Sequence, residues 1–192
     1  MHKMSLRHID KRKGERLYRI LFYDCRPFEK KAHNPVTNGS IDFSKTKQAD
    51  FRRSFHEELR RLRKVALRLG HLQDGKGWII RKDKTKSLLQ RKIAISDLEG
   101  DDVYYDIRQK GVDMKIGLDI ASLALKKMVE RIILISGDSD FVPAAKLARR
   151  EGIDFILDPM WNHVKPGLLE HIDGLKSTSK NPGPSRKKPN PL

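Results

Sequence analysis

The chain has 192 residues, a length that suits one domain with tails better than two domains. Lysine and arginine outnumber aspartate and glutamate by 41 to 25, and the net charge of +16 predicts attraction to polyanions, nucleic acid ahead of anionic membrane. No segment approaches the roughly 18 apolar residues that span a bilayer, so we expect no membrane insertion. The lone Cys25 excludes an internal disulfide or a cysteine zinc cage, which favours a reducing, cytoplasmic compartment.

The first half of the chain combines a buried strand with a long helix. Residues 1–16 are basic and polar, and we expect them to be loosely ordered. The apolar run Leu17–Tyr23 predicts a strand, and the Asn-Pro and Asn-Gly pairs within Lys30–Ser40 predict a loop. The clearest predicted helix is Asp50–Leu69, which Gly70 would end. Its apolar stripe repeats at steps of three and four residues and consists of Phe51, Phe55, Leu59, Leu62, Ala66 and Leu69.

The opposite half of this predicted helix is basic. Its cations are Arg52, Arg53, Arg60, Arg61, Arg63, Lys64 and Arg68. A solvated helix surface is the plain alternative, but only Glu57 and Glu58 offset these charges. The excess favours a face that binds phosphates. We select as nucleic-acid-binding candidates Arg53, Arg60, Arg61, Lys64 and Arg68.

The second half alternates strands and helices. In chain order we predict a short strand at Trp78–Arg81, a basic loop at Asp83–Lys92, a helix at Asp113–Met128, a strand at Arg131–Ile135, a helix at Phe141–Arg150, a strand at Ile153–Leu157, a helix at Pro166–Leu175 and a disordered basic tail at 176–192. Inward positions on the Asp113–Met128 helix are Ile116, Ile120, Leu123 and Ala124. This alternation indicates right-handed βαβ units and a mainly parallel sheet, with functional groups at the carboxyl ends of its strands.

Aspartates gather where such groups are expected. The strand ending at Ile135 leads into Ser-Gly-Asp-Ser-Asp-Phe, which places Asp138 and Asp140 at its carboxyl end. Helix capping explains the presence of one acid here better than the presence of two. Two carboxylates this close repel each other, and a hard cation such as Mg²⁺ or Mn²⁺ would relieve that repulsion. Asp119 lies at the edge of a buried helix face and needs a partner, either a metal or a lysine. Asp113 can act as a helix cap.

Other interpretations of these residues fail on context. The segment Asp138–Val142 fits the first motif of haloacid-dehalogenase-type phosphatases, but too little chain follows it for their core domain. An EF-hand loop requires glycine where Pro143 stands. The histidines at positions 56, 71, 163 and 171 are scattered and are expected on the surface or in the core.

The ordered set of motifs resembles the LabA-like NYN domain. It comprises Tyr23-Asp24-Cys25, the run from Gln109 to Asp119, the Ser136–Pro143 segment, and the strand and helix that close the domain near Leu175. The resemblance covers residues 17–175, between a basic segment at 1–16 and the tail at 176–192. It implies a PIN-like, Rossmann-like three-layer α/β fold and a ribonuclease that uses Mg²⁺ or Mn²⁺ to hydrolyse phosphodiesters.

The resemblance also assigns roles to the acids. Asp119 and Asp138 would bind metal, Asp140 would bind metal or orient water, and Asp113 would join them. RNA is the expected partner, DNA a possible one, and a homo-oligomer is possible. The alternative is a non-catalytic nucleic-acid-binding module or an adaptor.

One family feature is not found before Leu17. NYN domains open with a central strand whose final Asp-Gly supplies a metal ligand, and Ile9-Asp10 lacks the apolar run. We therefore expect impaired catalysis and a less stable sheet.

Overall fold

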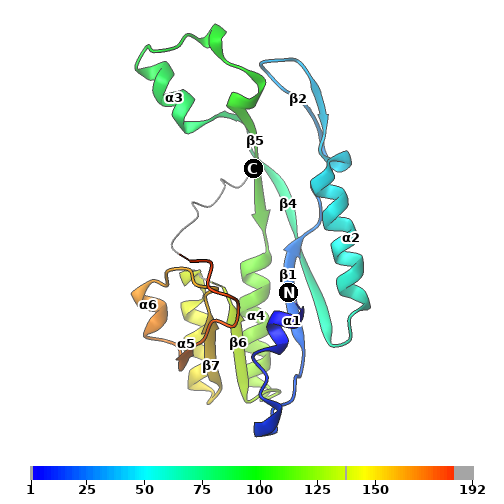
Figure 1. Ribbon diagram of the computed structural model, residues 1–192, viewed down its shortest axis with the longest axis vertical. Coiled ribbons are helices and arrows are strands. Elements are labelled where there is room, and N and C mark those ends of the chain that lie inside the picture. Colours follow the sequence, from blue (N-terminus) through cyan, green and yellow to red (C-terminus); the bar gives the residue numbers. More distant parts are fainter. Residues whose placement is uncertain (1, 137, 184–192) are drawn as a thin grey trace. The chain divides into compact units, whose positions relative to one another are not determined.

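The computed structural model describes residues 2–136 and 138–183, which fall into two compact units (Figure 1). The first unit comprises the chain up to Phe22, residues 63–68, and the chain from Asp113 onward. The second comprises residues 23–62 and 69–112. Strands β1 (Ile20–Cys25) and β4 (Val65–Ile80) contribute residues to both. No helix within the described ranges is long and apolar enough to cross a membrane.

The first unit is organised around a parallel sheet of order β6-β7-β8. Strand β6 (Arg131–Ile135) pairs with β7 (Asp154–Asp158), and β7 pairs with β8 (Gly174–Leu175). Helix α5 (Val142–Arg150) connects β6 to β7, and α6 (Pro166–Leu169) precedes β8. This arrangement brings the carboxyl ends of β6 and β7 to the same edge of the sheet.

The core of this unit lies on the inward positions of these elements. The fully buried side chains include Ala145, Ala148, Phe155, Leu157 and Leu168. Helix α4 (Val112–Leu125) buries Ile116, Ile120 and Ala124, three of its four predicted inward positions. This packing fixes the orientation of the remaining faces of α4, including the one that carries Asp119.

The second unit contains antiparallel pairs. Strand β4 pairs with β5 (Val103–Lys110), and the sheet order is β1-β4-β5. Strands β2 (Lys31–His33) and β3 (Ser40–Asp42) form a hairpin. Buried Asn34 stabilises the hairpin turn: its Oδ1 accepts the backbone N–H groups of Val36 and Thr37 at 2.9 and 3.2 Å. The helices are α2 (Lys47–Arg61), where Thr46 Oγ1 accepts the N–H of Ala49, and α3 (Lys82–Leu89).

The α/β class and the parallel βαβ unit are confirmed, but the prediction of a mainly parallel sheet is wrong. Parallel pairing joins β6, β7 and β8, whereas the β4–β5 and β2–β3 pairs are antiparallel. The β2–β3 hairpin falls in a segment assigned as loop, and the start of β4 falls in a segment assigned as helix. Strand β5 has no counterpart among the predicted elements.

The predicted helix Asp50–Leu69 is too long. Helix α2 ends at Arg61, Leu62 is extended, and Lys64 has a left-handed backbone with φ of 62°. Residues from Val65 onward belong to the 16-residue strand β4. Gly70 therefore does not end a helix but lies within a strand, and Phe51, assigned to the buried stripe, is 70% exposed. Strand pairing overrides the helical periodicity here.

Four further segments differ from expectation. The predicted helix Pro166–Leu175 ends at Leu169, and Gly174–Leu175 is strand β8. The predicted loop Lys30–Ser40 contains β2 and the start of β3, and the predicted loop Asp83–Lys92 contains most of α3. The amino-terminal segment, expected to be loosely ordered, contains helix α1 (His2–Leu6) and the buried His8. Of the predicted tail, residues 184–192 lie outside the described part of the chain.

Candidate acidic site and basic hollow

Asp138 and Asp140 follow the carboxyl end of β6, and both are exposed. The N–H of Asp138 donates to Ser136 Oγ at 3.2 Å, and Asp138 Oδ1 accepts the N–H of Asp140 at 3.1 Å. Phe141, which follows directly, is buried and anchors the segment. Asp138 thus helps to shape the local turn. Gly137 lies outside the described residues.

Asp119 lies on α4 beside the buried Ile116 and Ile120, as its position in the helical repeat predicted. One partner of Asp119 is Arg68, on β4, which belongs to the same unit. Arg68 Nε lies 3.0 Å from Asp119 Oδ2, and Arg68 Nη2 lies 3.4 Å from Oδ1. The guanidinium therefore reaches both carboxylate oxygens. An arginine thus stands where a lysine or a metal was predicted as a partner, and the metal-binding role of Asp119 remains a prediction.

Asp113 stands apart from this pair. It is exposed and lies inside the first turn of α4, where a carboxylate interacts favourably with the helix dipole. Across residues 2–136 and 138–183, no group of three or more His, Cys, Asp or Glu side chains is placed to hold a metal ion. The structure links Asp138 to Asp140 and links Asp119 to Arg68. The metal-ligand roles of these acids remain predictions.

Asp158, at the carboxyl end of β7, is a buried acid that sequence reasoning missed. Its Oδ1 accepts the N–H of Met160 at 2.8 Å, and its Oδ2 lies 2.9 Å from His8 Nε2 and 3.2 Å from the N–H of Thr178. Burial acts to raise the pKa of Asp158, but hydrogen bonds from the backbone of Met160 and Thr178 and from His8 lower it overall. Its position as the last residue of a parallel strand was the available signal.

This carboxylate holds the amino-terminal segment and the segment after β8 against the end of β7. His8 and Thr178 are separated by 170 residues and meet at Asp158. Both oxygens of Asp158 accept hydrogen bonds from within the protein, so it acts as a structural group. His8 Nδ1 is a buried nitrogen without a hydrogen-bond partner among the described residues.

A second histidine–aspartate pair lies in the second unit. His56 on α2 is 3% exposed, and its Nε2 lies 2.9 Å from Oδ2 of Asp24, near the end of β1. Arg52 Nε lies 3.6 Å from the same oxygen. His56 is therefore a core residue, one of the two locations expected for it. The pair holds α2 against β1.

The five predicted nucleic-acid-binding cations do not share one face. Only three of them, Arg53, Arg60 and Arg61, lie on α2. Arg60 pairs with Glu57 on the same helix, whereas Arg61 is exposed. Lys64 donates to the carbonyl of Leu17, and Arg68 pairs with Asp119.

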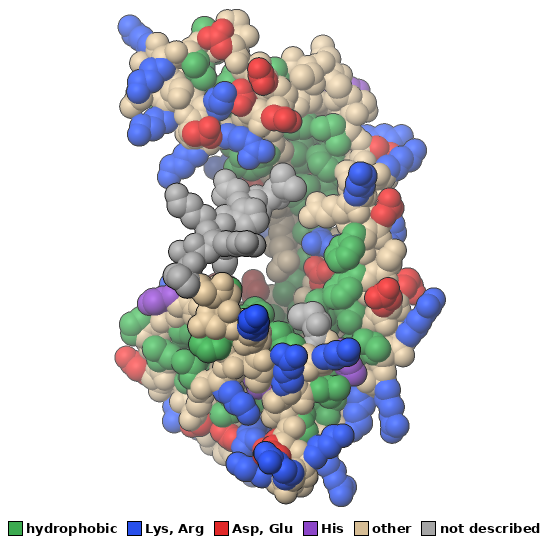
Figure 2. All heavy atoms as spheres, viewed as in Figure 1, with side chains coloured by type: hydrophobic (Ala, Val, Ile, Leu, Met, Phe, Trp, Pro, Cys, Tyr) green, Lys and Arg blue, Asp and Glu red, His purple; other side chains and the backbone are tan. Residues whose placement is uncertain are grey.

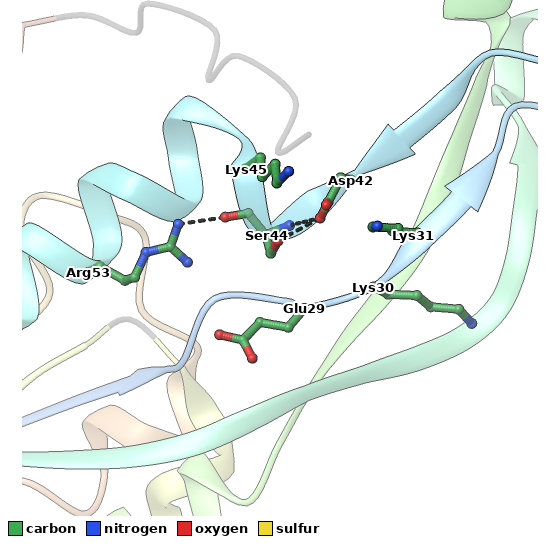
Figure 3. A pocket seen from close by; sticks show the side chains of 7 residues that line it. All are labelled: Glu29, Lys30, Lys31, Asp42, Ser44, Lys45 and Arg53. Atoms are coloured by element: carbon green, nitrogen blue, oxygen red, sulfur yellow. Dashed lines mark hydrogen bonds between the residues drawn. The ribbon is translucent and has the colours of Figure 1, made fainter.

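Cations gather instead around an open hollow of about 530 Å³ beside the β2–β3 hairpin and the start of α2 (Figure 3). We call this the basic hollow. Its lining residues are Glu29, Lys30, Lys31, Asp42, Ser44, Lys45 and Arg53. Of the predicted nucleic-acid-binding cations, only Arg53 lines the basic hollow. The lysines of the hollow were not predicted, because the β2–β3 hairpin beside it was assigned as loop.

Hydrogen bonds organise the basic hollow. The Ser44 hydroxyl donates to Asp42 Oδ1 at 2.6 Å, and this bond holds the pKa of Asp42 below its ordinary value. Arg53 Nη2 lies 2.7 Å from Asp50 Oδ1. Lys30 Nζ lies 2.6 Å from Asp74 Oδ2, and this bond raises the pKa of Lys30. The Lys31 and Lys45 side chains are exposed and form no ion pair with the described residues.

The chain matches the NYN domain model over residues 36–163, well over half of its length. It belongs to the NYN domain family. This confirms the resemblance at the level of the family, a PIN-like α/β family associated with nuclease-type function; the LabA-like subtype remains a prediction. No curated protein matches the chain. The chain is similar to a solved protein of unknown function from Vibrio parahaemolyticus, with 22% sequence identity and a TM-score of 0.41. The match covers 72% of this chain and 65% of that protein.

Proposed function

We propose that this NYN-family chain binds single-stranded RNA, with the basic hollow holding the sugar–phosphate backbone. The observation that supports this proposal is the convergence of four cations on one open surface against two carboxylates. Lys31 and Lys45 are exposed, so their ammonium groups are available to phosphates. Binding of this kind releases counterions from the nucleic acid, and the affinity therefore falls steeply as salt increases.

An aromatic pair on α2 supports the preference for unpaired strands. The rings of Phe51 and Phe55 are stacked, with centroids 5.9 Å apart and planes 5° from parallel, and Phe51 is 70% exposed. An exposed ring offers a face on which a base can stack, whatever its sequence.

Metal-dependent hydrolysis of RNA is a second candidate function. Exposed Asp138 and Asp140 favour it, because they follow a parallel strand at its carboxyl end, where α/β proteins place ligands. Carboxylate oxygens are also the ligands that Mg²⁺ and Mn²⁺ prefer. The arrangement as it stands does not fit a metal centre, because Arg68 holds both oxygens of Asp119. We therefore derive no catalytic step through a metal.

Charge reversal tests the binding function. We expect Lys31→Glu/Lys45→Glu to weaken binding of a fluorescent single-stranded RNA several-fold, measured by anisotropy over a range of salt concentrations. The slope of log affinity against log salt should decrease by about 1 for each phosphate that the variant no longer neutralises.

The matched control reverses two lysines elsewhere in the same unit. Lys and Arg side chains are spread over the face of the molecule drawn in Figure 2, so loss of net charge alone weakens binding somewhat. Lys82→Glu/Lys86→Glu makes the same change of charge on exposed positions of α3. Equal losses of RNA affinity in the two double variants would contradict a specific role for the basic hollow. RNA binding that does not depend on salt concentration would contradict it as well.

A further inference from the structure

The turn that follows β7 carries a tryptophan at the carboxyl edge of the parallel sheet. Residues 159–162 leave the end of β7, which pairs with the end of β6, and Trp161 is 48% exposed although its side chain is large and mostly apolar. Met160, next to it, is 38% exposed. In open α/β sheets, ligands bind in the crevice at the carboxyl ends of the strands. An exposed aromatic ring at this place is therefore a candidate ligand contact.

The backbone of this turn is strained. Met160 and Trp161 have φ of 51° and 66°, so two consecutive residues with side chains adopt the left-handed conformation that glycine favours. Such conformations persist only where the surrounding structure enforces them, and they concentrate at sites that bind ligands. Here Asp158 Oδ1 accepts the N–H of Met160 at 2.8 Å, and the carbonyl of Pro159 accepts the N–H of Asn162 at 2.9 Å. These bonds hold the turn in the conformation that displays Met160 and Trp161.

The segment after β8 fixes the Trp161 ring and supplies positive charge. Trp161 Nε1–H donates to the carbonyl of Ser179 at 2.9 Å, and the backbone N–H of Trp161 donates to Ser177 Oγ at 3.3 Å. Lys176 and Lys180, which flank these serines in the chain, are both exposed. Proteins bind single strands by combining aromatic rings, on which bases stack, with cations, which bind the phosphates. Trp161 and this segment bring both features together in the first unit.

We propose that Trp161 is a stacking platform for a base of single-stranded RNA, with Lys176 and Lys180 binding the adjoining phosphates. This inference rests on the proposed RNA binding, and it adds a base-binding position in the first unit to the basic hollow of the second. Every base has a π face, so stacking of this kind tolerates any sequence. The position therefore selects for unpaired bases and not for a particular sequence.

Quenching of tryptophan fluorescence tests the proposal. The chain has two tryptophans, and Trp78→Phe leaves Trp161 as the single reporter. A uridine-rich single-stranded RNA should quench the Trp161 emission as it saturates the protein, while the anisotropy of a labelled RNA reports binding in parallel samples. An abasic oligonucleotide carries the same phosphates without bases, so it should cause little quenching at concentrations at which it is bound.

Substitutions separate base stacking from a purely structural role. Trp161→Ala should weaken RNA affinity about fivefold or more, since fivefold is the lower end of what stacking of one base contributes. Trp161→Phe loses the bond to Ser179 but keeps a ring, so it should retain most of the affinity. An equal loss in these two variants would show that Trp161 only anchors the segment after β8. Leu169→Ala removes an apolar side chain of similar exposure, 42%, from the same unit and should leave RNA affinity unchanged.

RNA binding without quenching of Trp161 would overturn this proposal and leave the basic hollow unaffected. Equal RNA affinity of the wild type and of folded Trp161→Ala would overturn it as well. If no RNA complex forms at all, the proposed function fails, and this inference fails with it. Should Trp161→Ala or Trp78→Phe not fold, the wild type and Trp161→Phe decide the question, because equal quenching in these two proteins would contradict the proposal.

Discussion

At the scale of single residues, the sequence singled out Asp119, Asp138 and Asp140 but not the buried Asp158. Asp138, Asp140 and Asp119 follow recognisable local signals, namely a strand end and the edge of a helix face. Asp158 depends on His8 and Thr178, partners 150 and 20 residues away in the chain, which local patterns do not reveal. The partner of Asp119 was likewise predicted as a lysine or a metal. The position of a carboxylate at the edge of a buried face shows that it needs a partner, but the identity of that partner depends on residues far away in the chain.

Asp158 should make the stability of the protein sensitive to acid. Its pKa is lower in the folded protein than the ordinary aspartate value of 3.8, so the folded state binds fewer protons than the unfolded chain. The stabilisation is complete above that ordinary value and is lost as the pH falls through the lower folded value. Urea denaturation at a series of pH values from about 6 down to about 2, which extends well below the ordinary carboxyl pKa of about 4, measures this loss.

Asp158→Asn should destabilise the protein by about 1–3 kcal/mol at neutral pH, because buried donors lose a charged acceptor. The same variant should lose part of the acid dependence. Thr178→Val removes the hydroxyl contact to Asp158 at 3.3 Å, together with those to His8 and Met4, but keeps the backbone N–H bond to Asp158, and it should show a smaller effect on both quantities. An Asp158→Asn variant that retains the full acid dependence would contradict the assignment.

At the scale of elements, local segments were predicted well and paired segments poorly. Strand β6 has the predicted bounds, α5 begins one residue later than predicted, and β7 is shifted by one residue at both ends. Each of these elements carries its own apolar pattern and stop signal. The end of α2 and the β2–β3 hairpin were wrong because long-range strand pairing decides them. Gly70 illustrates this: its role is visible only when β5 lies beside β4.

Gly70→Ala should be strongly destabilising. A Cβ at this position would lie 2.4 Å from the carbonyl oxygen of Lys110 and 2.8 Å from Val112 Cγ2, and the backbone oxygen cannot move without disturbing the β4–β5 pairing. We expect a loss of about 1–3 kcal/mol in the free energy of unfolding. Chemical denaturation of the variant checks this value.

Gly117→Ala is the matched control. Gly117 lies inside α4, and no atom approaches within 4 Å of a Cβ placed there. Alanine should stabilise the helix by up to about 1 kcal/mol because it restricts the unfolded chain more than glycine does. A neutral Gly70→Ala, or a destabilising Gly117→Ala, would show that the register of these elements is misassigned.

At the scale of the whole molecule, the net charge of +16 and membership of the NYN family are the basis for the proposed nucleic-acid partner. The charge was expected to concentrate on one long helix. Instead the predicted cations divide between the two units, and several are neutralised by acids of their own unit. The surface that best fits phosphate, the basic hollow, arises from a hairpin whose pairing was not apparent in the sequence.

The central claim is that the chain binds RNA while its acids, as arranged, support little hydrolysis. The most direct measurement incubates a labelled single-stranded RNA with excess protein and Mn²⁺, then follows complex formation and cleavage products in the same samples. We expect a salt-sensitive complex, weak or undetectable cleavage, and the same result for Asp138→Asn. Robust Mn²⁺-dependent cleavage by the wild type that disappears in Asp138→Asn would contradict the account.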